Sequence, residues 1–474
     1  MIQKKTKVSV TFFIFMMTFN LYGQETALIK NDTLTMDQKL DSIAKSLLSR
    51  DSDSLNGYLN EDLFGIIDTS VQSQYPFIGF DQNHYQFYTK ESPAFEKLFF
   101  EIQQMVKTKN GKLNFYHIGG SHIQADIYTN DMRQYLAKYW EDLPGERGWV
   151  FPFKMARTNN PWNYGFTSKN EWTGHRSVIH RSDSVHYGLL GAAISSTDRK
   201  LNLSFDYKGD NEKLPIDHIR VYHNKGELAY NIKYDPIKNP IVHQFTNEQF
   251  GFTDTYFKKE FTSFDVEFIK KNDSLISDSI RNKSLFIYGF QLMNNQPGIA
   301  YTAIGINGAG LYTYRDNENF TEQLSQAPPH FFAFSVGTND ANVPYDQFDP
   351  QEYKRNLEGL MKKVLLANPD CAILLTVPND SYYKRKYLNK NIDRERTVII
   401  ELAKKYEIPV WDLYGLMGEL GSSKTWSTNK LMKSDLVHFS VDGYHLKGDL
   451  FFEAFLKWIE QMENKPPITI LNKE

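Results

Sequence analysis

A serine that could act as a nucleophile stands early in the chain, where an apolar strand pattern gives way to a helix pattern. The apolar and aromatic run 113–118 leads through Gly120 into Ser121, and helical spacing follows over 126–139. This order exposes the serine hydroxyl at the carboxyl edge of a parallel sheet, where open α/β folds bind their ligands. A hydroxyl becomes a good nucleophile only with a base in contact and a third group that orients the base. Taken alone, Ser121 is more typical of a turn or a helix N-cap.

A carboxylate and a histidine that could complete such a triad lie near the C-terminus. Asp435 precedes His438 by three residues, so its carboxylate can accept a hydrogen bond from one imidazole nitrogen while the other nitrogen faces the serine. Asp442 and His445 have the same spacing. We favour Asp435 and His438, because His445 falls at the predicted last helix whereas His438 lies in the loop before it, and loops at a sheet edge carry catalytic groups.

Two further motifs offer hydrogen-bond donors for a negatively charged intermediate. The segment 335–340 ends a second apolar strand and contains Asn339, whose amide could donate to an oxyanion over the sheet edge. A glycine-rich turn after another strand offers the backbone amide of Gly308, with Gly310 as the alternative. We expect the backbone amide of Ser121 to complete this oxyanion hole. Each motif also fits an ordinary turn.

The elements that must position these residues form an α/β pattern. The predicted strands after the first one are 299–306, 331–336 and 372–377. The predicted helices are 93–106, 126–139, 353–366, 394–406 and 447–462. Strands that alternate with helices of this length predict a doubly wound parallel sheet.

A β-rich segment interrupts this α/β pattern. Short alternating runs separated by turn residues occur at 201–207, 216–222, 229–234, 262–269 and 285–292. They predict a β-sandwich-like insert. The predicted organisation is a signal peptide at 1–23, an N-terminal extension at 24–92, a discontinuous α/β domain at 93–148 and 296–465, and the β-rich insert at 149–295.

In their order along the chain, the motifs resemble the four signature blocks of the SGNH (GDSL-type) hydrolase family. The resemblance implies a flavodoxin-like α/β fold and a serine esterase that works through an acyl-enzyme. It implies Ser121 as the nucleophile, His438 as the base and later the acid, and Asp435 as the group that orients His438. Gly308 and Asn339 then join the amide of Ser121 in the oxyanion hole.

One position departs from the family, which commonly has Asp before the serine, where this chain has Gly120. The blocks cover residues 113–130 and 299–450, and the β-rich interruption is similar to that of peptidoglycan O-acetylesterases, whose insert resembles a carbohydrate-binding module. The resemblance therefore implies removal of O-acetyl groups from a polysaccharide, with peptidoglycan as a candidate. Transfer of the acyl group to a glycan hydroxyl and non-catalytic polysaccharide binding stay open as alternatives.

The first residues predict export. Lys4, Lys5 and Lys7 precede the apolar run 8–19. This run is shorter than the ~20 residues of a membrane span, which favours a cleaved signal peptide over an anchor. The chain has one cysteine, Cys371, so its core and not a disulfide must hold it together. We therefore expect a periplasmic or extracellular protein with no membrane insertion of the mature chain.

Charge and histidine spacing argue against two other classes of protein. The formal net charge is -3, and no basic stripe interleaved with aromatics occurs, so nucleic acid is not expected as a partner. His175, His180 and His186 lack ligand-like spacing with carboxylates, so we predict no metal. We also predict no cofactor, which leaves an acetylated polysaccharide as the expected partner.

Three tryptophans, Trp149, Trp162 and Trp172, follow the first block. Their faces could stack on sugar rings, although burial between the insert and the α/β domain is the favoured interpretation. Asp126 is expected in the first turn of the helix after Ser121, where a carboxylate interacts favourably with the helix dipole.

Overall fold

The computed structural model describes residues 67–464, apart from 90–91, 141, 180, 182–183, 210–212 and 272–282. The predicted signal peptide, the N-terminal extension up to residue 66 and His180 lie outside the described residues, so those predictions stay predictions. All the described residues belong to one compact unit. Within these ranges, no helix combines the length and apolar character needed to cross a bilayer.

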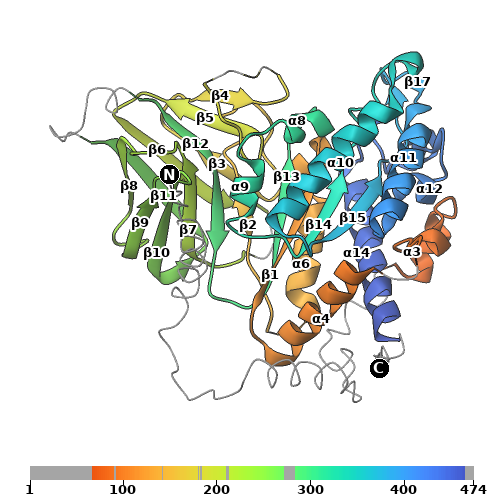
Figure 1. The fold of residues 1–474 in the computed structure, drawn as a ribbon, viewed down its shortest axis with the longest axis horizontal. Coiled ribbons are helices and arrows are strands. Elements are labelled where there is room, and N and C mark those ends of the chain that lie inside the picture. The colour runs from red at the N-terminus through yellow and green to blue at the C-terminus, as the bar shows by residue number, and fades with distance from the viewer. Residues whose placement is uncertain are drawn as a thin grey trace, which may run out of the picture. The chain divides into compact units, whose positions relative to one another are not determined.

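Parallel strands form the central sheet of the α/β part (Figure 1). In sheet order they are β13 (Gly298–Gly305), β1 (Lys112–Gly119), β14 (Phe331–Ser335), β15 (Ala372–Val377) and β18 (Val410–Asp412). Each of these strands runs parallel to its neighbours. Counted along the chain, the described strands are arranged 2-1-3-4-5, the doubly wound order of flavodoxin-like folds. The predicted fold class is confirmed.

Helices cover both faces of this sheet, because its strands are apolar on both sides. Successive residues of a strand point to opposite faces, so Phe115 and Tyr116 of β1 enter different cores. The helices that share the core of Phe115 are α4 (Pro93–Thr108), α6 (Tyr128–Tyr139) and α14 (Val441–Glu463). The helices that share the core of Tyr116 are α8 (Leu311–Arg315), α9 (Phe320–Leu324), α10 (Pro350–Ala367) and α11 (Asn391–Tyr406).

Short elements complete the α/β part. The short helices are α3 (Thr69–Gln74), α5 (Ser121–Gln124), α12 (Leu413–Met417), α13 (Ser422–Thr428) and the single turns η3 (Phe80–Gln82) and η4 (Tyr345–Gln347). A small hairpin joins β16 (Tyr382–Tyr383) to β17 (Tyr387–Leu388).

Antiparallel strands between Gly148 and Met293 form the β-sandwich-like insert (Figure 1). One sheet has the order β4 (Thr173–Arg176), β5 (Ala192–Ser196), β12 (Leu285–Met293), β7 (Ile216–His223), β10 (Phe252–Phe261) and β9 (Ile241–Asn247), with β2 (Gly148–Val150) paired to β12. The other has the order β3 (Tyr164–Thr167), β6 (Lys200–Tyr207), β11 (Ser263–Lys270) and β8 (Tyr230–Tyr234). The rings of Phe166 and Phe290, one from each sheet, lie 5.1 Å apart, so aromatic side chains fill the space between the sheets.

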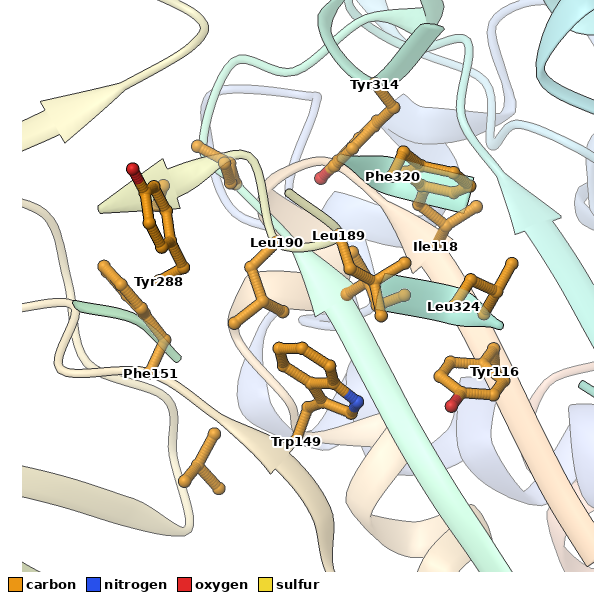
Figure 2. Packing of buried hydrophobic residues seen from close by; sticks show 14 of the residues in the cluster. Tyr116, Ile118, Trp149, Phe151, Leu189, Leu190, Tyr288, Tyr314, Phe320 and Leu324 are labelled. Atoms are coloured by element: carbon orange, nitrogen blue, oxygen red, sulfur yellow. The ribbon is translucent and has the colours of Figure 1, made fainter. Parts of the chain in front are cut away.

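The insert and the parallel sheet share a core. Trp149 and Leu190 belong to the insert, yet their buried side chains lie in one cluster with Ile118 of β1 and Leu324 of α9 (Figure 2). Burial of large apolar side chains on both sides of this boundary fixes the insert to the α/β part. Loops that leave the insert can therefore occupy fixed positions at the edge of the parallel sheet.

Candidate active site

Ser121 begins α5, and a single residue, Gly120, separates it from the end of β1 at Gly119. In the register of the sheet, Gly119 of β1 pairs with Gly305 on one side and with Ser335 on the other. Ser121 therefore lies at the carboxyl edge of the sheet, next to the ends of β13 and β14. This is the position that the strand, turn and helix pattern predicts.

The imidazole of His438 contacts the Ser121 hydroxyl. The Oγ atom of Ser121 lies 2.9 Å from Nε2 of His438. Nδ1 of the same ring lies 2.8 Å from Oδ2 of Asp435. The structure thus brings the three predicted residues into one line of hydrogen bonds, in the order that a serine nucleophile requires.

The loop that carries the histidine is held in place by its own hydrogen bonds. Oδ1 of Asp435 accepts from the backbone N–H of Val437 at 3.0 Å and from that of His438 at 2.9 Å. Leu436 adopts a left-handed backbone conformation with φ +56°, which closes this tight turn. Burial alone would raise the pKa of Asp435, but the hydrogen bonds from His438 and Val437 outweigh it and lower the pKa below 3.8. The carboxylate is therefore ionised and able to orient His438 near neutral pH.

The competing histidine contacts a different carboxylate. His445 lies within α14, and its Nδ1 atom is 2.9 Å from Oδ2 of Asp131 on α6. This contact ties two helices together. Helix α14 begins at Val441, earlier than the predicted 447, so it contains His445 and leaves His438 in the loop before it.

Asn339 and Gly308 also lie at this edge. Nδ2 of Asn339 donates to the backbone carbonyl of Ala309 at 3.0 Å, which leaves a second amide hydrogen for another acceptor. Gly308 has φ +85°, and the place where a Cβ would stand is open. The turn is fixed to α5, because the N–H of Asn307 donates to Oε1 of Gln124 at 2.6 Å. Sequence reasoning missed Gln124, which only the three-dimensional contact identifies.

The structure gives a reason for the glycine that departs from the family pattern. A Cβ on Gly120 would lie 2.9 Å from Nδ2 of Asn339 and 3.3 Å from the carbonyl oxygen of Ala309. A side chain at this position would therefore press on the very amide that is proposed as an oxyanion donor. Glycine lets the amide of Asn339 approach the turn before Ser121.

A second histidine packs behind the first. His122 is buried, its Nδ1 atom lies 2.9 Å from the hydroxyl of Tyr444, and its ring centroid lies 5.3 Å from that of His438. Burial, with the charge of Lys447 nearby, lowers the pKa of His122 well below its ordinary value. A neutral His122 can support the His438 ring without adding a competing charge.

Asp126 corrects one expectation from the sequence. It lies between α5 and α6 with φ +48°, and the residue that caps α6 is Ile127, so Asp126 is not in the first turn of that helix. Its buried carboxylate instead accepts from the guanidinium of Arg133 at 3.2 Å and from that of Arg147 at 2.7 Å. Burial would raise the pKa of Asp126, but the two guanidinium groups outweigh it and lower the pKa. The carboxylate anchors the segment after Ser121.

The described residues contain no group of three or more His, Cys, Asp or Glu side chains placed to hold a metal ion. The predicted triad and oxyanion donors do not depend on one.

Comparison with known proteins relates this geometry to a family. Residues 284–446 match the GDSL-like Lipase/Acylhydrolase family. The matched segment contains Gly308, Asn339, Asp435 and His438, while Ser121 precedes it. No curated protein sequence matches the chain.

Solved structures resemble the chain at low sequence identity. A peptidoglycan O-acetylesterase aligns with 80% of this chain and 99% of its own, with a TM-score of 0.62 and 17% identity. A lipase/acylhydrolase from Enterococcus faecalis aligns with 36% of this chain and 80% of its own, with a TM-score of 0.26 and 21% identity. A family two carbohydrate esterase from Cellvibrio japonicus aligns with 63% and 98%, with a TM-score of 0.25 and 9% identity. Of these three, the first is similar enough to bear on the fold.

Proposed function

We propose that this chain, whose residues 284–446 match the GDSL-like Lipase/Acylhydrolase family, is an exported serine esterase of the SGNH (GDSL-type) that removes O-acetyl groups from a polysaccharide. The line of hydrogen bonds from Ser121 through His438 to Asp435 is the observation that carries the proposal. Such a line activates the serine oxygen for attack on an electrophile such as an ester carbonyl carbon.

The proposed reaction has two acyl transfers. In the first, Oγ of Ser121 attacks the ester carbonyl carbon while Nε2 of His438 takes the hydroxyl proton. The protonated ring then gives that proton to the departing sugar oxygen, which leaves an acyl-enzyme and a free sugar hydroxyl. In the second, His438 takes a proton from water, which attacks the acyl carbon, and acetate leaves as Ser121 recovers its proton.

The donors around the serine fit the charge that develops in both steps. The tetrahedral intermediate carries a negative oxygen, and the backbone amides of Ser121 and Gly308 and the side-chain amide of Asn339 are its proposed donors. Asn339 is already held by the carbonyl of Ala309, so its orientation is fixed before the substrate binds. Donors fixed in advance stabilise the transition state without a reorganisation cost.

Two observations support a polysaccharide as the substrate. The similarity to a solved peptidoglycan O-acetylesterase covers 80% of the chain, which is more than the residues outside the insert make up, so it includes part of the insert. The positively charged and apolar N-terminal pattern favours export, which would bring the protein to envelope or extracellular glycans. At 17% identity the likeness shows the fold, and the substrate is therefore our inference.

Acetate release tests the proposal. We would incubate the mature protein with O-acetylated peptidoglycan, acetylated xylan and acetylated cello-oligosaccharides, and quantify free acetate against the Ser121→Ala variant. Release of acetate that is lost in Ser121→Ala supports the proposal. Adding an excess of unacetylated oligosaccharide then distinguishes hydrolysis from transfer, because a transferase would acetylate this acceptor. The absence of release from every glycan, with p-nitrophenyl acetate still turned over, would contradict the polysaccharide assignment but not the esterase.

A further inference from the structure

Trp162 differs from the other tryptophans of the chain. The chain has seven tryptophans, all among the described residues, and six of them are at most 8% exposed. Trp162 is 48% exposed. Trp149 and Trp172 are buried as the sequence interpretation favoured, whereas Trp162 is not.

The exposed indole stands on backbone that is fixed beside the nucleophile. The N–H of Trp162 donates to the carbonyl of Ala125 at 2.9 Å, and Ala125 directly follows α5, the helix that Ser121 begins. At 1.5 Å per residue, Ala125 is about 6 Å along that helix from Ser121. The next residue, Asn163, is buried and donates to Asp126 at 3.1 Å. The backbone is thus held on both sides of the exposed ring.

The loop before Trp162 is tied to the same helix. Nε2 of Gln124 donates to Oγ1 of Thr158 at 3.0 Å and to the carbonyl of Asn159 at 2.6 Å. Nδ2 of Asn307, beside the proposed oxyanion donor Gly308, also reaches Thr158 at 3.1 Å. Residues from the insert side of the chain therefore form part of the rim around Ser121.

We propose that Trp162 is a sugar-binding platform that positions a ring of the glycan chain next to Ser121, and this inference rests on the proposed esterase function. A large aromatic side chain left in water on a rigid backbone forgoes the free energy of burial, which a stacked ligand would restore. Its exposed neighbours in the loop include Lys154, Arg157 and Asn159. A single aromatic face among polar groups suits a sugar, with apolar C–H faces and hydroxyl edges, better than a long acyl chain.

Oxidation of the indole tests the contact without requiring turnover. The Ser121→Ala variant would be treated with limiting N-bromosuccinimide, which oxidises accessible indoles, with and without soluble O-acetylated peptidoglycan strands, and mass spectrometry would follow each tryptophan. We expect Trp162 to be oxidised first and to be protected by the glycan, with the buried tryptophans as internal references. Oxidation of Trp162 at the same rate under glycan saturation would overturn the proposal, whatever the outcome of the acetate assay.

Kinetics provide the second arm. Trp162→Ala is expected to lower kcat/KM for a short acetylated oligosaccharide about 5- to 30-fold relative to p-nitrophenyl acetate, mainly through KM, and Trp162→Tyr should restore much of the loss. Phe245→Ala is the matched control, because Phe245 is a 40% exposed aromatic on β9 of the insert, and we expect no change with either substrate. An unchanged ratio in Trp162→Ala would also overturn the proposal. If the wild type releases acetate from no glycan, the esterase assignment to glycans fails, and the oxidation experiment still decides whether Trp162 binds sugar.

Discussion

Nε2 of His438 lies 2.9 Å from Oγ of Ser121, although 317 residues separate them in the chain. This contact makes the hydroxyl dependent on one imidazole for its reactivity. Ser121→Ala and His438→Ala should each lower kcat for p-nitrophenyl acetate by roughly 10⁴-fold or more, with the thermal unfolding profile retained. Near wild-type turnover in Ser121→Ala would exclude Ser121 as the nucleophile.

The carboxylate of Asp435 sets the tautomer of His438 through Nδ1 at 2.8 Å. In Asp435→Asn the amide cannot hold the proton on Nδ1 in the same way, so we expect kcat to fall by about 10⁴-fold. His445→Ala is the matched control, because His445 contacts Asp131 and not Asp435. Equal losses in the two variants would point to a general structural effect. Because hydrogen bonds from His438 and Val437 lower the pKa of Asp435 from its ordinary value, its protonation should not limit activity near neutral pH.

Asn339 should matter for the rate and not for the fold. Nδ2 of the half-buried Asn339 side chain donates one hydrogen to the carbonyl of Ala309, and its second amide hydrogen is proposed to donate to the oxyanion. Asn339→Ala is expected to lower kcat about 100- to 1000-fold while KM for p-nitrophenyl acetate changes little. A loss confined to KM would show that Asn339 binds the ground state and not the transition state.

Gly120 is expected to be intolerant of a side chain for a geometric reason. In Gly120→Ala the new Cβ would lie 2.9 Å from Nδ2 of Asn339, so this amide must shift from its present position. We expect a roughly 10- to 100-fold lower kcat. Gly359→Ala is the matched control, since Gly359 lies in α10 and its nearest atoms would be 3.7 Å from the new Cβ. If Gly120→Ala retained full activity, the close approach would have no functional meaning.

Short-range signals in the sequence predict the strands and the catalytic turn well. The strand predicted at 372–377 matches β15, because it is a short, mostly apolar run whose residues are all buried. The serine turn and the Asp435 loop are each recognised from a few consecutive residues next to a predicted strand or helix. Their positions at the edge of the sheet then follow from the alternation of strands and helices.

Elements that depend on distant neighbours were missed. β18 is only three residues long and is held in the sheet by β15. β9 is exposed along most of its length, so it shows no alternation of apolar and polar residues. The sequence predicts Asp126 in the first turn of a helix, because nothing in the local pattern reveals that the guanidinium of Arg147, from a later segment, pairs with its carboxylate.

Lys447 provides a prediction about stability that local sequence would not suggest. Its side chain is 4% exposed, and Nζ lies 4.2 Å from the ring centroid of Tyr128 and 5.4 Å from that of Phe439. Burial lowers the pKa of the Lys447 amine from 10.5 to about 7. Between pH 7 and pH 10.5 the Lys447 amine is protonated in the unfolded chain and mostly neutral in the folded one. The unfolded state therefore binds more protons, so the free energy of unfolding rises with pH over this range. The destabilisation caused by Lys447 is greatest below pH 7, where the buried amine must carry its charge.

Lys447→Met removes the amine and keeps most of the side-chain volume. We therefore expect it to raise the free energy of unfolding by about 1 to 4 kcal/mol at pH 6, with a smaller gain at pH 9, as measured by urea denaturation. The same substitution at exposed Lys424 should show no such dependence on pH. A gain that is identical at both pH values would mean that the aromatic rings already compensate the buried charge in full.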